Sequence, residues 1–80
     1  MFYSYIIQSD ADQSQYAGLS RDPGKRLQDH NQGRVKSTKS KIPWRIIHSE
    51  SYPTRIEARK REKYLKSAAG RRFRKRFKGA

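Results

Sequence analysis

Three side chains in the first half of the chain could act together on a phosphate group. Arg26 and His30 stand four residues apart, so they share one face of any helix that contains them. Tyr16 falls at the end of an expected strand, which can carry its phenol to the same side. A guanidinium can bind phosphate oxygens, and a phenol and an imidazole can move protons. This combination suits phosphate chemistry on a basic protein.

A hairpin is expected to position the tyrosines. Residues 2–7 are aromatic and β-branched, which is typical of a strand, and residues 15–19 form the expected return strand. The polar residues 9–14 between them suit a turn. Side chains alternate along a strand, so Tyr5 and Tyr16 can lie on the same face of the sheet.

A capped helix is expected to carry the arginine and the histidine. Asp22 can accept hydrogen bonds at its start, and Pro23 suits the first helical position, where an N–H is not needed. The helix is expected to run from Pro23 to about Gln32. Asn31 and Gly33 mark its end.

A basic loop and a third strand follow. Residues 33–42 show no periodicity, and Pro43 ends that loop. Residues 44–48 read as a strand that begins with the chain's only tryptophan, Trp44, which we assign to the core. His48 on that strand has no acidic partner nearby in sequence, and we interpret it as structural.

The next helix carries one carboxylate on its apolar face. Thr54 and Glu57 form a capping box at its start, which gives Glu57 a local role. Glu62 has no such role. At 100° per residue it falls in the core-facing stripe, which consists of Ala58, Glu62, Leu65 and Ala69.

We expect Gly70 to interrupt that helix. A basic C-terminal helix at about 70–78 would follow, anchored by Phe73 and Phe77. The element order is then strand, strand, helix, strand, helix, helix. This order predicts one α+β domain over residues 1–80, with a small three-stranded, mainly antiparallel sheet flanked by helices.

The charge distribution points to a polyanionic partner. Twenty Lys and Arg oppose seven Asp and Glu, for a net charge of +13, and residues 55–80 hold twelve basic residues against two acidic ones. Nucleic acid is the partner we favour over a merely solubilising surface or a basic membrane-binding helix. The residues expected to contact it are Arg34, Lys36, Lys39, Lys41, Arg71, Arg72, Arg74 and Lys75.

Other classes of protein find no support in the sequence. There is no cysteine for a disulfide or a thiolate metal site, and no apolar run long enough to span a bilayer. The N-terminus shows no export signal. We therefore expect a cytoplasmic location, associated with the nucleoid if the organism is bacterial.

Five segments together resemble the GIY-YIG nuclease domain. Tyr3-Ser4-Tyr5 stands where the family has Gly-Ile-Tyr, and Tyr16-Ala17-Gly18 where it has Tyr-Ile-Gly. Residues 26–31, 43–47 and 57–66 are similar to later family segments. The resemblance covers essentially the whole chain, and is strongest to small single-domain bacterial members, many without an assigned function.

The resemblance implies a role for each of five residues. Tyr5 and Tyr16 match the motif tyrosines, of which Tyr16 is the usual candidate for activating the attacking water. Arg26 matches an arginine that holds the scissile phosphate, and His30 a histidine near it. Glu62 matches the glutamate that binds the single divalent cation, Mg²⁺ or Mn²⁺. Mg²⁺ can be held by one carboxylate together with substrate phosphates, so a lone glutamate is chemically sufficient.

The same residues also have structural interpretations. Tyr5 and Tyr16 could be ordinary sheet aromatics. Arg26 and His30 could belong to a solvated helix face.

For Glu62 the structural interpretation is an ion pair within its own helix. The partner would be a basic residue about one turn away, Arg59 or Lys66. The place of Glu62 on the apolar stripe argues against such a surface pair.

These observations predict a divalent-metal-dependent endonuclease that hydrolyses DNA phosphodiester bonds. We expect a preference for DNA structure rather than sequence, possible use in DNA repair or recombination, and help from a targeting partner protein. The alternative is a non-catalytic module of the same fold that binds DNA or RNA. A third hypothesis is a basic accessory protein that docks on an acidic partner.

Overall fold

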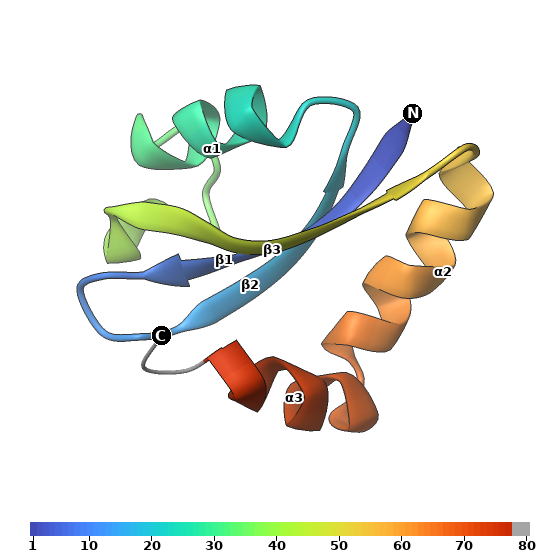
Figure 1. The fold of residues 1–80 in the computed structure, drawn as a ribbon. Helices are drawn as coiled ribbons and strands as arrows, with labels where there is room; N and C mark the ends of the chain where they lie inside the picture. The colour runs from blue at the N-terminus through green and yellow to red at the C-terminus, as the bar shows by residue number, and fades with distance from the viewer. Residues whose placement is uncertain (78–80) are drawn as a thin grey trace.

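The computed structural model describes residues 1–77. Three antiparallel strands form one sheet in the order β2-β1-β3 (Figure 1). Helix α1 lies on one side of the sheet, and α2 and α3 lie on the other (Figure 1). The α+β prediction is therefore confirmed. The elements are β1 Phe2–Ser9, β2 Gln15–Ser20, α1 Pro23–Asn31, a 3₁₀ turn Lys39–Lys41, β3 Trp44–Tyr52, α2 Arg55–Lys66, α3 Ala68–Arg74 and a 3₁₀ turn Lys75–Phe77.

The central strand β1 supplies both halves of the core. Tyr5 and Ile7 pack with Trp44 on the side of α1, whereas Ile6 packs with Ala17 and with Leu65 of α2 on the other side. Alternate side chains of a strand point to opposite faces, so β1 can be buried on both. The assignment of Trp44 to the core is confirmed, because only 4% of its surface is exposed.

Strand β3 is longer than its apolar residues suggested. It continues past His48 to Tyr52 and pairs with β1 along this whole length, with an irregular register between Ile6 and Ile7. The extension is polar, and Glu50 within it receives hydrogen bonds from Arg61 of α2 at 2.8 and 3.1 Å. Its carboxylate also lies 2.7 Å from Nε2 of His48, so the expectation that His48 has no acidic partner nearby in sequence is wrong. Backbone pairing and an ion pair hold this part of β3, so it lacks the apolar residues from which a strand can be predicted in a sequence.

The break between the last two helices falls at Ser67, so the expected interruption at Gly70 is wrong. Ser67 has an extended backbone, and its hydroxyl accepts a hydrogen bond from the N–H of Gly70 at 3.2 Å. Gly70 itself is buried inside α3, where a Cβ would lie 2.6 Å from the backbone of Leu65. This glycine is needed for close packing rather than for a break. The helix expected at 70–78 is also shorter, since α3 ends at Arg74, and Lys78 lies outside the described residues.

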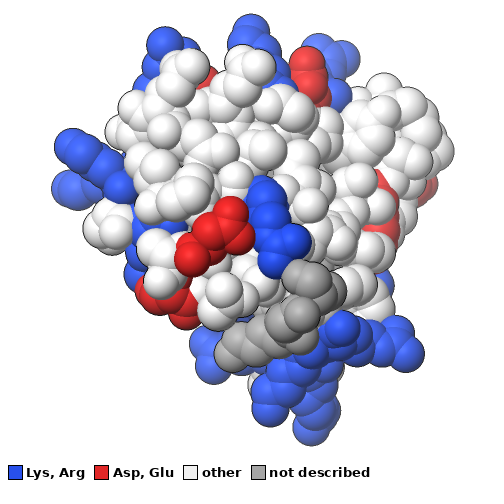
Figure 2. All heavy atoms as spheres, turned by 60° about the vertical axis from the view of Figure 1, so that its left-hand side comes forward, with Lys and Arg blue, Asp and Glu red and all other residues white. Residues whose placement is uncertain are grey.

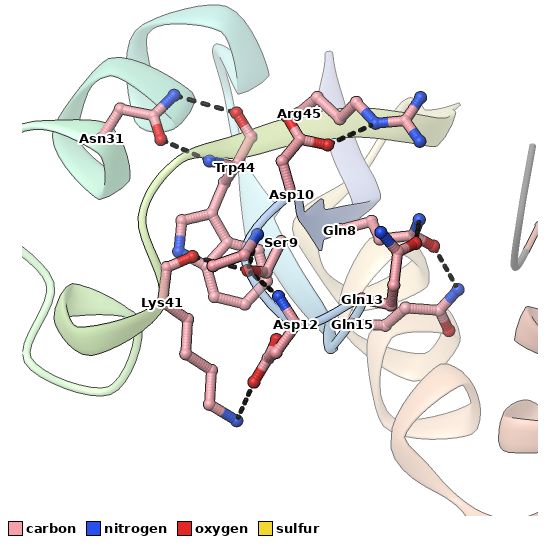
Figure 3. A network of polar contacts seen from close by, with 11 residues as sticks. Gln8, Ser9, Asp10, Asp12, Gln13, Gln15, Asn31, Lys41, Trp44 and Arg45 are labelled. Carbon is pink, nitrogen blue, oxygen red and sulfur yellow. Dashed lines mark hydrogen bonds and ion pairs between the residues drawn. The ribbon is translucent and has the colours of Figure 1, made fainter.

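The basic loop before β3 is tied down at both ends. Asn31 accepts a hydrogen bond from the N–H of Trp44 at 2.6 Å and donates one to its carbonyl at 2.9 Å (Figure 3). The Ser9 hydroxyl donates to the carbonyl of Lys41 at 2.6 Å (Figure 3). These bonds fix the path of residues 33–42, which carry Thr38 into the interior. Within residues 1–77, no helix is long and apolar enough to cross a membrane.

Candidate active site

Gly18 makes room for the ring of Tyr5. The two residues are cross-strand partners, and a Cβ on Gly18 would come within 2.5 Å of Cζ of Tyr5. The tyrosine thus lies over the glycine and covers the gap that a missing side chain leaves in the sheet. Tyr16 is paired with Ile7, two residues further along β1. Both tyrosines therefore lie on the face of the sheet that carries α1, as expected from alternation.

A buried hydrogen-bond chain runs from the sheet through α1 to the basic loop. The Tyr5 hydroxyl lies 3.0 Å from Nε2 of His30, and Nδ1 of His30 lies 2.8 Å from Oγ1 of Thr38. The Thr38 hydroxyl donates to the carbonyl of Val35 at 3.3 Å. These partners are all satisfied when the Tyr5 hydroxyl donates to Nε2 and Nδ1–H donates to Thr38. His30 is completely buried, so the solvated-face interpretation is wrong for this residue.

Burial determines the protonation states of Tyr5 and His30 in this series of hydrogen bonds. It raises the pKa of Tyr5 from 10.0 to about 12, although the nearby positive charge of Arg26 offsets part of the effect. Burial, with the charge of Arg26, also lowers the pKa of His30. Tyr5 therefore keeps its proton and His30 stays neutral near pH 7, as the hydrogen-bond directions require.

Tyr16 lies against His30, the middle member of this series of hydrogen bonds, and is partly open to solvent. Its ring meets that of His30 edge-on, with 5.3 Å between the ring centroids. The ammonium of Lys66, from α2, lies 5.6 Å from the centroid of the Tyr16 ring. Tyr16 thus stands between groups from α1 and from α2 at the sheet edge formed by β2.

Arg26 is the positively charged member of the candidate site residues on α1. Its side chain is 42% exposed, and one guanidinium nitrogen lies 3.7 Å from a carboxylate oxygen of Asp29. It lines an open cavity of about 360 Å³ together with Ser20, Arg21, Asp22, Lys25 and Asp29. The cavity leaves the guanidinium accessible to a ligand while Asp29 limits its movement.

Glu62 is the candidate site residue on α2. Its side chain is 17% exposed, and its Oε2 accepts a hydrogen bond from Lys66 at 3.3 Å. Its negative charge adds to the rise in the pKa of Tyr5, which indicates proximity across the sheet edge. The sequence argument against an ion pair within the helix is therefore wrong. Glu62 is both largely buried and paired with Lys66.

The donor set around Glu62 fits one mode of metal binding. In residues 1–77 no group of three or more His, Cys, Asp and Glu side chains could hold a metal ion. A cage of protein ligands is thus absent from the described part of the chain. Mg²⁺ needs no such cage, because it keeps most of its waters and is often held by one carboxylate and substrate phosphates. Glu62 can supply that one carboxylate.

The basic residues expected to contact nucleic acid divide into two groups. Four of them, from the loop and from the C-terminal helical segment, line one cavity: Lys41, Arg71, Arg74 and Lys75. The others are exposed and lie outside it. Among these, Arg34 forms an ion pair with Asp29 at 3.2 Å, and the rest are Lys36, Lys39 and Arg72.

Sequence reasoning missed three contributors to this region. Thr38 has no motif, and only the fold brings its hydroxyl to His30. Lys66 was considered only as an alternative partner of Glu62, although its i+4 spacing was a usable signal. Lys25, one residue before Arg26 in the sequence, lines the same cavity.

The arrangement defines a class of protein. The motif tyrosines lie on a hairpin, the arginine and the histidine on the next helix, and the glutamate on the helix after β3. A family model described as "GIY-YIG catalytic domain" matches residues 1–76. The chain belongs to the GIY-YIG family, which is a family of nucleases.

Individual relatives carry the designation UPF0213. A UPF0213 protein of Haloquadratum walsbyi is 36% identical over 66 residues, which cover 81% of this chain and 73% of that protein. A UPF0213 protein of Staphylococcus aureus strain N315 is also 36% identical over 66 residues, covering 81% and 79%. The solution NMR structure of a UPF0213 protein from Bacillus halodurans matches all of this chain and 88% of that one, with 28% identity and a TM-score of 0.56.

Proposed function

We propose that this protein is a divalent-metal-dependent endonuclease that hydrolyses DNA phosphodiester bonds. One observation carries the proposal: groups from β1, β2, α1 and α2 form a continuous contact path at the β2 edge. The path runs through Tyr5, His30, Tyr16, Lys66 and Glu62, with Arg26 beside Tyr5. Phosphodiester hydrolysis needs a proton acceptor for water and positive charge on the phosphate, and this path offers both.

Tyr16 is the tyrosine better suited to accept a proton from the attacking water. It is partly exposed, whereas Tyr5 is 1% exposed and its hydroxyl is occupied by His30. The ammonium of Lys66 lies over the Tyr16 ring, so a cation from α2 stands next to the phenol.

Arg26 is suited to hold the scissile phosphate. A guanidinium can donate two parallel hydrogen bonds to phosphate oxygens and stabilise the charge that grows on them. Its partial exposure at the 360 Å³ cavity gives a phosphate room to approach. The cations Arg21 and Lys25 line the same cavity and would attract the DNA backbone.

Tyr5 and His30 are assigned positioning roles. Both ring nitrogens of His30 are engaged within the protein, by Tyr5 and by Thr38. The imidazole therefore has no nitrogen left for a phosphate while this chain is intact. It holds the ring of Tyr16 in place instead.

Glu62, together with substrate phosphate and water, would hold the Mg²⁺ or Mn²⁺ ion. When bound, such an ion stabilises negative charge on phosphate and leaving-group oxygens. Lys66 bonds only Oε2 of Glu62, so Oε1 could hold the ion while the ammonium stays near Tyr16.

A non-catalytic nucleic-acid-binding module is the second candidate. The Glu62–Lys66 ion pair favours it, because the neighbouring ammonium repels a divalent cation and partly neutralises the carboxylate. The excess of basic residues serves either candidate. Only cleavage distinguishes them, since both predict salt-sensitive binding to DNA.

The deciding experiment is a cleavage assay on single-stranded, duplex, flapped and branched DNA, with and without Mg²⁺ or Mn²⁺. Wild type is compared with Glu62→Gln and Arg26→Ala, and with Glu57→Gln as a control carboxylate on the same helix. We expect metal-dependent cutting, strongest on one branched or flapped substrate as a role in repair or recombination requires. That cutting should be lost in the first two variants and kept in the third. Binding without cutting on every substrate would favour the module, and cutting by Glu62→Gln would remove Glu62 from the mechanism.

A further inference from the structure

A second cavity, of about 370 Å³, lies between the β1–β2 hairpin and the C-terminal helical segment. Its walls come from segments far apart in sequence. Neutral side chains of the hairpin form one side, and basic side chains form the other. The lining residues are Gln13, Ser14, Gln15, Lys41, Arg71, Arg74 and Lys75.

The charge of this cavity is strongly positive. Four cations line it, and no carboxylate is among the lining residues. Lys41 is partly neutralised, since its ammonium lies 3.6 Å from Asp12 and donates to the Ser14 hydroxyl at 3.1 Å. In Figure 2, basic side chains gather at the lower end of the molecule, where Figure 1 places α3. A surface of this kind attracts anions.

Arg74 carries a buried donor that the described part of the chain leaves unsatisfied. Its Nε is inaccessible to solvent and has no hydrogen-bond partner within residues 1–77. Leaving a buried donor of a charged group unpaired is costly. Burial and the neighbouring charge of Arg71 also lower the pKa of Arg74, and an anion in the cavity would offset the repulsion between these two arginines.

The hairpin side of the cavity is held in place by side-chain hydrogen bonds. Gln8 donates to Gln13 at 2.7 Å and accepts from Gln15 at 3.2 Å (Figure 3). Gln15 also donates to the carbonyl of Arg74 at 3.1 Å, which joins the hairpin to α3. The cavity is therefore preformed between two tied elements.

The position of this cavity relates it to the proposed active site. It lies at the Gln15 end of β2, whereas the cavity at Arg26 lies at the Ser20 end. Tyr16 of the proposed active site follows Gln15 directly in β2, so the two sites lie along the same strand.

We propose that this cavity binds a second backbone phosphate of the nucleic acid, separate from the phosphate held by Arg26. The proposal rests on the proposed function, in that the ligand is the substrate itself. The two sites together would fix the direction of the strand along β2. Free phosphate offers the same chemistry, and the tests separate the two sources.

The first test follows the Nε–H resonance of Arg74 by ¹H–¹⁵N NMR. The protein is the Glu62→Gln variant, so that DNA is not cut, and the probes are a 12-base-pair DNA duplex and inorganic phosphate. We expect the duplex to shift this resonance in step with binding, and equal concentrations of inorganic phosphate to leave it unchanged. A resonance that ignores bound DNA, or that responds only to inorganic phosphate, would overturn the proposal.

The second test measures DNA affinity as a function of salt by fluorescence anisotropy. Arg71→Gln is compared with Arg72→Gln, which removes the same charge from the same helix outside the cavity. We expect Arg71→Gln to weaken binding by about tenfold and to lower the salt slope by about 1, as for one lost phosphate contact. Arg72→Gln should weaken binding much less.

The outcomes separate this proposal from the nuclease proposal. If wild type cuts DNA but Arg71→Gln and Arg72→Gln bind equally, the cavity proposal fails alone. If Arg71→Gln loses affinity selectively while wild type never cuts, the cavity proposal stands and the nuclease proposal fails. A wild-type protein that binds no DNA overturns both.

Discussion

The hydroxyl of Tyr5 donates to Nε2 of His30 across 3.0 Å, and so joins the centre of the sheet to helix α1. Both groups are almost completely buried. The bond explains how a strand and a helix that share few apolar contacts are kept in register, since α1 contributes only Leu27 as a large apolar residue. It also gives the two motif tyrosines different proposed roles, with Tyr5 as a positioning residue and Tyr16 as the proton acceptor.

Tyr5→Phe and Tyr16→Phe should therefore have different effects. Tyr5→Phe leaves Nε2 of His30 buried without a donor, which should lower the free energy of unfolding by about 1–3 kcal/mol. Tyr16→Phe should leave stability nearly unchanged but slow cleavage by about 10²–10⁴-fold, as for loss of a general base. Urea unfolding and single-turnover cleavage measure the two effects. The reverse pattern would assign the base to Tyr5.

Replacing Lys66 should strengthen metal binding. The ammonium of Lys66 competes with a divalent ion for Glu62, and such helix pairs are worth roughly 0.3–0.5 kcal/mol. Lys66→Met should therefore raise Mn²⁺ affinity by about twofold, as measured by electron paramagnetic resonance of free Mn²⁺. Lys63→Met, on the same helix, serves as the control. Unchanged or weaker Mn²⁺ binding would mean that Lys66 does not shield a metal ligand.

Glu50 should make folding sensitive to acid. Burial opposes its ionisation, but hydrogen bonds from Tyr52, His48 and Arg61 lower the pKa of Glu50 from 4.5 to about 2. The lowered pKa stabilises the fold above about pH 4.5, and this stabilisation is lost as the pH falls towards 2. The full effect corresponds to about 3 kcal/mol.

Glu50→Gln should accordingly lose up to that amount at pH 7 and show a flatter stability profile between pH 4.5 and 2. Chemical denaturation at a series of pH values measures this profile. Glu57→Gln, which removes an exposed carboxylate, should change stability by less than about 0.5 kcal/mol. Parallel profiles for wild type and Glu50→Gln would contradict the assignment.

Two glycine-to-alanine substitutions should act in opposite directions. At Gly70 a Cβ would collide with the backbone of Leu65, so Gly70→Ala should destabilise the fold by about 1–3 kcal/mol. At Gly24, inside α1, the nearest atom is a carboxylate oxygen of Asp22 at 3.6 Å. Gly24→Ala should therefore stabilise by up to about 1 kcal/mol through helix propensity. Thermal unfolding compares them, and a harmless Gly70→Ala would refute the packing role of that glycine.

Local signals in the sequence predicted most of the fold. The hairpin, the helix capped by Asp22 and the helix capped by Thr54 depend on neighbouring residues, and each is present. The break at Ser67 was not predicted, because it depends on how closely α3 approaches α2. The polar half of β3 was missed for a similar reason, since Arg61 stabilises it from another element.

The candidate site likewise contains residues that the sequence predicted and residues that only the fold brings into place. Family motifs indicated Tyr16, Arg26 and Glu62, whose side chains the fold gathers at the β2 edge. The link between His30 and Thr38 could not be predicted, because it depends on the path of an aperiodic loop. The cavity at Arg74 likewise requires the hairpin and α3 to be seen together.

The sheet order β2-β1-β3 has a consequence for the nascent protein. The strand synthesised first lies in the middle, and its second neighbour is not complete until Tyr52. Glu62 comes later still, on the helix that covers the finished sheet. A growing polypeptide therefore cannot assemble the proposed site piecemeal, and the site would form only once α2 packs on the three-stranded sheet.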